Sequence, residues 1–165
     1  MNIWIVEDRD TDALNAANAV LRALADADET PRSVRLWRNS AVHWGAPLRA
    51  IDVSESGAAL TDRLAPEALK QLAPTIAVLD LFDSGDVFTA GDFLQSLRDW
   101  EQKNKLPKSY VVLWSIWSGE TDVQHFVKGE PARDPQVCWL DTKDTLSLKL
   151  AVQGYLNTYW QKEFQ

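Results

Sequence analysis

The chain has 165 residues, of which 45% are hydrophobic, enough for one domain with a core of its own. Its net charge of −7 disfavours a broad nucleic-acid-binding surface, because phosphate contacts need clustered Lys and Arg. The single cysteine, Cys138, excludes an intramolecular disulfide. No apolar run approaches the roughly 20 residues of a membrane span, and no signal-peptide pattern begins the chain. We therefore expect a cytoplasmic protein without a membrane partner.

The first third of the chain predicts a strand, a helix and a less regular segment. Residues 2–7 form a short apolar run typical of a buried strand. In the helix that follows, Thr11 or Asp12 can cap the first turn, and the apolar positions are Leu14, Ala17, Leu21 and Leu24. From Ser33 the sequence predicts at least one strand, with a loop or hairpin around Gly45 and Pro47.

The remaining elements continue the alternation of strand and helix. Short helices are predicted on both sides of Pro66 and near Glu120, and the last helix runs from about Thr145 to Trp160. Its apolar side is expected to consist of Leu146, Leu150, Tyr155, Leu156 and Tyr159. The other segments are the strands "TIAVLDL", "SYVVLWS" and "QVCWL" and the helix "AGDFLQSLRDWEQKN".

This order of elements predicts an α/β fold. Near-continuous apolar strands linked by helices indicate a five-stranded parallel sheet, doubly wound, with helices on both faces. We expect a single domain over residues 1–165, with an extended segment around 30–74. In such sheets ligands bind at the carboxyl ends of the strands.

Acidic residues stand at two of these strand ends. Glu7 and Asp8 follow the first strand, and Asp80 ends the third. If the two strands are neighbours, the three carboxylates converge, and a pair ~4 Å apart repels by about 4 kcal/mol at an effective dielectric of about 20. A cation should therefore lie among them, and hard oxygen ligands suit Mg²⁺. The alternative is that Glu7 and Asp8 only lead into the next helix, whose N-terminus favours acids.

The stretches "IWIVEDRDTDAL", "IAVLDL", "GDFLQSLR" and "YVVLWS", with a lysine after the last strand, resemble the receiver domain of bacterial response regulators. The resemblance covers nearly the whole chain and implies a flavodoxin-like fold. It also implies a place in a two-component phosphorelay, in which a histidine kinase phosphorylates an aspartate of the receiver.

The resemblance implies a role for each matching residue. Glu7 and Asp8 match the acidic pair that holds Mg²⁺, and Asp80 matches the phospho-acceptor. Ser115 matches the hydroxyl residue that contacts the phosphoryl group, and Lys143 is the candidate for the lysine that pairs with it. If Trp139 fills the aromatic switch position, however, Thr142 rather than Lys143 falls in the lysine position.

The chain also differs from the family pattern near Asp80. No proline follows this aspartate, the insert "FDSGDVFTA" delays the next helix, and bulky Ile116 and Trp117 follow Ser115. These side chains should narrow the space for a phosphoryl group. The expectation is therefore weak or absent phosphoryl transfer, as in a degenerate receiver that signals without phosphate.

A second family offers an alternative of another class. The acidic residues "IVEDRDTDAL" and "LDLFDSGD" also look like a toprim nuclease or primase core, which binds Mg²⁺ for phosphodiester chemistry. Asp8 replaces the glycine of that motif, Asp80 and Asp83 have D-x-x-D spacing instead of D-x-D, and the acidic net charge argues against this reading. No G-x-G-x-x-G or Walker motif is present. His43 and His125 are isolated.

The predicted output is contact with another protein rather than catalysis. The last predicted helix ends shortly before Gln165, with no DNA-binding domain after it. The expected partner is a histidine kinase or another signalling protein, with a second copy of the chain as a further candidate. Tyr159, Trp160 and Phe164 are the aromatic residues most available for such contact, although Tyr159 could equally pack in the core.

Overall fold

A computed structural model of the chain describes residues 1–7, 9–37, 50–52, 71, 73–80, 90–115, 134–140 and 142–160. The centre of the fold is one sheet with the strand order β3-β2-β1-β4-β5-β6. Only β3 is antiparallel to its neighbour, β2; the other pairs are parallel. The strands are β1 (Asn2–Val6), β2 (Ser33–Trp37), β3 (Ala50–Asp52), β4 (Ile76–Leu79), β5 (Tyr110–Trp114) and β6 (Val137–Leu140).

The five parallel strands confirm the predicted flavodoxin-like α/β fold, since β3 is a short addition at one edge. Strand order reverses between β1 and β4, which are hydrogen-bonded neighbours. The predicted hairpin after Ser33 agrees with the antiparallel pairing of β2 and β3. Its turn lies outside the described residues, as do most of the 30–74 extension and the short helices expected near Pro66 and Glu120.

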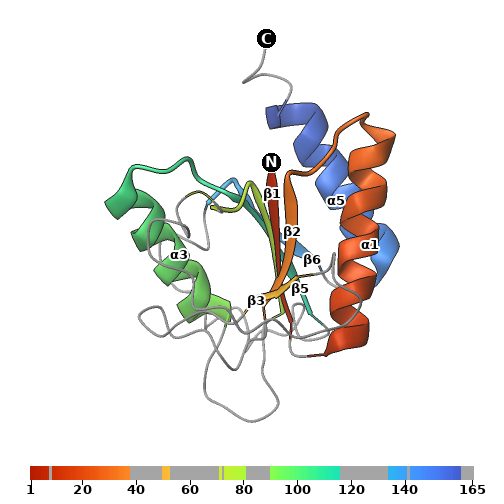
Figure 1. Cartoon of the computed structure of the whole chain (residues 1–165), viewed down its shortest axis with the longest axis horizontal. Helices are drawn as coiled ribbons and strands as arrows, with labels where there is room; N and C mark the ends of the chain where they lie inside the picture. Colours follow the sequence, from red (N-terminus) through yellow and green to blue (C-terminus); the bar gives the residue numbers. More distant parts are fainter. Residues whose placement is uncertain are drawn as a thin grey trace.

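Helices cover both faces of the sheet (Figure 1). Helix α3 (Ala90–Asn104) lies on one face, and α1 (Asp10–Asp26) and α5 (Thr145–Tyr155) lie together on the other. Helix α5 continues as a π-helical turn, Leu156–Trp160. Among the described helices, none combines the length and the hydropathy required for a transmembrane span.

The central strands are buried because both of their faces are covered. All residues of β1, β4 and β5 are buried. Ile3 and Ile5 belong to the core beneath α1 and α5. Trp4 points to the opposite face, where its ring stacks on Trp100 of α3 at a centroid distance of 6.3 Å. This two-sided burial explains the near-continuous apolar sequence of these strands.

The predicted apolar faces of two helices are partly wrong. Leu14 of α1 is 48% exposed, and Leu146 and Leu150 of α5 are 63% and 56% exposed. Tyr155 and Leu156 are buried as predicted, and the other buried positions of α5 are Leu148 and Val152 instead of Leu146 and Leu150. Helix α1 buries mainly small side chains, which let it lie close to the sheet and to α5. The buried residues of α1 are Ala13, Ala16, Ala17, Ala19, Val20, Ala23 and Leu24.

Replacing a buried and an exposed leucine of α5 tests this assignment. Leu148→Ala should lower the free energy of unfolding by about 2 to 5 kcal/mol, because it opens a cavity in the core. Leu146→Ala should change it by less than about 0.5 kcal/mol, as expected for an exposed position. Urea denaturation of both variants measures the difference. Equal losses would contradict the observed orientation of α5.

Candidate functional site

Two of the predicted acidic residues meet at the carboxyl ends of neighbouring strands. Glu7 follows β1 and Asp80 follows β4, and the strands pair through Val6 and Leu79. The backbone N–H of Asp80 donates to the carbonyl oxygen of Val6 at 2.9 Å. Glu7 and Asp80 are only 4% and 8% exposed. The strand pairing therefore holds two carboxylates side by side in a site with little solvent.

Lys143 places its ammonium group among these carboxylates. The Nζ atom lies 2.7 Å from Oε2 of Glu7, 3.3 Å from Oδ2 of Asp12 and 3.4 Å from Oδ2 of Asp80. The Lys143 side chain is 11% exposed. Thr142, the alternative for the lysine position, is exposed and donates its hydroxyl to Asp144 instead. The structure thus brings Lys143, and not Thr142, into the site.

The surroundings of Lys143 favour its protonated form. Burial alone would lower its pKa, but the hydrogen bond to Glu7 and the negative charges of Asp80, Glu7 and Asp12 act in the opposite direction. Together they raise the pKa of Lys143 above its ordinary value. The ammonium is therefore a permanent cation of the site at neutral pH.

Asp12 is a site residue that the sequence prediction missed. Thr11 or Asp12 was expected to cap the first helix, but the N-cap is Arg9, whose side chain makes no capping hydrogen bond. The backbone N–H of Arg9 donates to Oε1 of Glu7 at 3.2 Å. Asp12, in the first turn of α1, turns to Lys143 and also pairs with Arg9 at 3.6 Å. The sequence signal available for this contact was the acidic run after the first strand, in which Asp12 follows Glu7 by five residues.

Trp114, the last residue of β5, contacts both Lys143 and the residue that follows it. Its ring centroid lies 5.2 Å from the Lys143 ammonium, within cation–π range. Its indole N–H donates to the backbone carbonyl of Asp144 at 3.0 Å. In the sequence Trp114 belongs to the predicted strand "SYVVLWS", and nothing in the local pattern of a buried strand indicates either contact.

Asp144 fixes the start of α5 directly after Lys143. Its carboxylate accepts hydrogen bonds from the backbone N–H of Ser147 at 2.8 Å and from the hydroxyls of Ser147 and Thr142 at 2.6 Å each. The Ser147 hydroxyl bond is the main cause that lowers the pKa of Asp144 to about 2. The Lys143 side chain therefore emerges from a backbone that is anchored on its C-terminal side.

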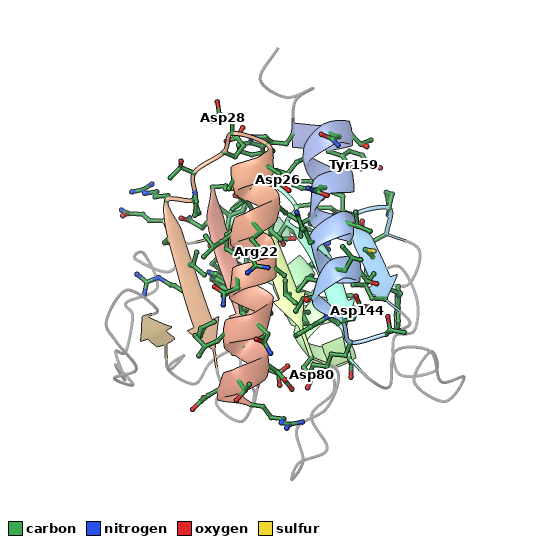
Figure 2. All side chains as sticks on the ribbon, turned by 90° about the vertical axis from the view of Figure 1, so that its right-hand side faces the viewer. Arg22, Asp26, Asp28, Asp80, Asp144 and Tyr159 are labelled. Carbon is green, nitrogen blue, oxygen red and sulfur yellow. The ribbon has the colours of Figure 1, made fainter. Side chains whose placement is uncertain are left out.

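Ser115 follows Trp114 and is completely buried. Because Leu79 pairs with Leu113, the end of β5 lies beside Asp80. Figure 2 shows Asp80 and Asp144 at one end of the molecule, opposite Asp26, Asp28 and Tyr159. The acidic and bulky residues expected around this site at Asp8, Asp83, Ile116 and Trp117 lie outside the described part of the chain, as do His43 and His125.

The donor chemistry of the site fits Mg²⁺. Glu7 and Asp80 offer the one or two carboxylates that Mg²⁺ usually takes beside its waters. Within the described residues, which omit Asp8, no group of three or more acidic, His or Cys side chains is arranged to hold a metal ion. Lys143 offsets one of the three negative charges it contacts, so two remain when all groups are ionised. A divalent cation would match that remainder.

Cys138 and the C-terminal aromatic residues lie away from this site. Cys138 is half-buried in the edge strand β6 and has a free thiol. Tyr159 is 39% exposed and stacks on Tyr155, whereas the half-buried Trp160 donates its indole N–H to Glu29 at 2.8 Å. Phe164 is not among the described residues.

Comparison of the chain with protein-family models, with curated proteins and with solved structures gives no match.

Removing the Lys143 ammonium should destabilise the protein, because three carboxylates then lose their shared cation. Removing one partner of a fully buried ion pair lowers the free energy of unfolding by about 3 to 5 kcal/mol. Because the Lys143 side chain is slightly exposed, we expect a smaller loss of roughly 2 kcal/mol for Lys143→Met. The matched control is Lys149→Met, because Lys149 pairs with the half-exposed Asp26 and should lose less than about 1 kcal/mol. Urea denaturation in metal-free buffer measures both. Similar losses would contradict the central position of Lys143.

The stability difference between the wild type and Lys143→Met should depend on pH in the direction set by the raised pKa of Lys143. Since the pKa of Lys143 is raised on folding, its contribution is complete below the ordinary lysine value of about 10.4 and is lost as the pH rises through the folded-state pKa. The difference in unfolding free energy between the wild type and Lys143→Met should stay constant from about pH 6 to 9 and narrow above about pH 10. Narrowing at neutral pH would contradict the direction of the shift.

Proposed function

We propose that this chain is a receiver-like signalling module in which Asp80 accepts a phosphoryl group from a histidine kinase and which acts through contact with another protein. The observation that carries the proposal is the placement of the Lys143 ammonium between Glu7, Asp12 and Asp80 at the strand ends. In the sequence, either Lys143 or Thr142 could fill the lysine position. The contacts of Lys143 with Glu7, Asp12 and Asp80 support Lys143 as the lysine of the proposed site.

Each group has a chemical part in this proposal. A carboxylate oxygen of Asp80 attacks the phosphorus of a phosphohistidine, the new O–P bond forms as the N–P bond breaks, and the imidazole leaves and takes up a proton. Lys143, 3.4 Å from Oδ2 of Asp80, offsets charge on the phosphoryl oxygens. Mg²⁺ held by Glu7 and Asp80, with Asp8 as a further ligand expected from the sequence, would neutralise more of that charge.

Exposed leucines give a partner a place to bind near the acidic residues. Leu14 lies in the first half of α1 and Leu146 in the first turn of α5, and both are about half exposed or more. These two helices lie side by side and begin at the end of the sheet that carries the site (Figure 2). Exposed apolar side chains beside the site supply apolar area that a protein partner would bury on binding. We name Leu14 and Leu146 the leucine rim.

Labelling with a small phosphodonor tests Asp80 as the acceptor. Incubation of the wild type with acetyl phosphate and Mg²⁺ should add one phosphoryl group, detected by intact-mass spectrometry. Asp80→Asn should remove the labelling, and Lys143→Met should slow it roughly a hundredfold, the loss expected for one group that stabilises developing charge. Asp99→Asn, on the exposed side of α3, is the control and should label like the wild type. Labelling that survives in Asp80→Asn would refute the proposal.

The leucine rim can be tested separately from the chemistry. Leu14→Arg and Leu146→Arg should slow phosphoryl transfer from a phosphorylated histidine-kinase domain by about tenfold, as expected when an interface loses roughly 1.4 kcal/mol. Labelling by acetyl phosphate should be unchanged, because this donor needs no interface. A substitution that slows both reactions equally would show damage to the site rather than to a partner surface.

A further inference from the structure

Trp114 contacts both Lys143 and the backbone that follows it. Its ring lies 5.2 Å from the Lys143 ammonium, and its indole N–H donates to the carbonyl oxygen of Asp144 at 3.0 Å. The residue itself is buried at the end of β5, within the core shared by the sheet, α1 and α5. Its ring therefore cannot shift freely when one of the two contacts changes.

The contact with Asp144 leads directly to the start of α5. The same residue that offers its carbonyl to Trp114 uses its carboxylate to bind the backbone N–H of Ser147 at 2.8 Å. This bond satisfies one of the N–H groups that the first turn of a helix leaves unpaired. A displacement of Asp144 would thus weaken the cap and loosen the first turn of α5, where Leu146 is exposed.

The other end of the connection is the acidic site. Lys143 divides its ammonium between Glu7 at 2.7 Å and the more distant Asp12 and Asp80. A change of charge at Asp80 alters the balance of these attractions, so the ammonium moves toward or away from the partners that remain. The ammonium lies against the Trp114 ring, so its movement changes the forces on that ring. The changed forces in turn alter the geometry of the hydrogen bond from the indole N–H to Asp144.

We propose that Trp114 is a positioning residue that holds Lys143 in the acidic site and transmits a change at Asp80 to the first turn of α5. The path runs from Asp80 through Lys143 and the indole of Trp114 to Asp144 and Ser147. Under the proposed function it links phosphorylation to the leucine rim at Leu146, and that meaning rests on the proposed function. The coupling itself needs only a change of charge at Asp80.

Nuclear magnetic resonance and amide hydrogen exchange test the coupling without any phosphodonor. In the wild type, Asp80→Asn should shift the indole N–H resonance of Trp114, one of eight tryptophans, which Trp114→Phe identifies. It should also change amide exchange in the first turn of α5, residues 145–148, several-fold. In Trp114→Phe, which keeps an aromatic ring but lacks the donor, Asp80→Asn should leave exchange in this turn unchanged.

Trp100→Phe is the matched control, since Trp100 stacks on Trp4 across the opposite face of the sheet. In this variant the response of α5 to Asp80→Asn should persist. If Trp114→Phe fails to fold, benzothienylalanine at position 114 replaces it, because this residue keeps the bicyclic shape without an N–H. An α5 response that persists without the donor would show transmission through the covalent Lys143–Asp144 connection and would overturn the proposal. So would the absence of any response in the wild type.

The test separates this inference from the proposed function. Asp80→Asn changes the site whether or not Asp80 accepts a phosphoryl group. A loss of coupling in Trp114→Phe together with no labelling by acetyl phosphate would support Trp114 as the link and reject phosphorylation as its trigger. Labelling by acetyl phosphate together with an α5 response that persists in Trp114→Phe would support phosphorylation of Asp80 and reject Trp114 as the link.

Discussion

The attraction between one ammonium group and three carboxylates is the constraint on which the carboxyl end of the sheet depends. A parallel sheet brings the carboxyl ends of its strands to one edge, so Glu7 and Asp80 are close because β1 and β4 are neighbours. Unscreened by water, such carboxylates would oppose folding. Lys143 reverses this effect by contacting both of them and Asp12. The connection between β6 and α5 must therefore end where the lysine can reach.

The sequence was sufficient to predict the sheet and the residues at its strand ends. Strands buried on both faces need continuous apolar runs, and these runs are short, separate and bounded by polar residues, so their positions could be read directly. Helix faces were harder to predict. In α5 the large exposed Leu146 and Leu150 each lie two positions from a buried residue, Leu148 or Val152. The spacing of apolar residues could not decide which pair is buried, because Leu146 and Leu150 are four residues apart and so are Leu148 and Val152.

Asp12 and Trp114 escaped the sequence analysis for a different reason. Acidic residues in the first turn of a helix have a sufficient local explanation in capping and the helix dipole, which hides a tertiary contact. A tryptophan in an apolar strand is likewise explained by burial. Their contacts with Lys143 join segments more than a hundred residues and about thirty residues apart. Only the assembled fold reveals which ordinary positions face the site.

A second buried ion cluster at the opposite end of β5 shows what a fixed arrangement looks like in the same protein. Arg98 donates to Glu101 and to Asp134, at 2.8 Å each, and to the carbonyl oxygen of Ser109. Glu101 in turn accepts from the N–H and hydroxyl of Ser109. A rigid guanidinium with several short bonds ties α3 to the beginnings of β5 and β6. Lys143, by contrast, has a flexible stem and one short contact among three, so the carboxyl end of the sheet is the end whose charges can rearrange while the other end stays in place.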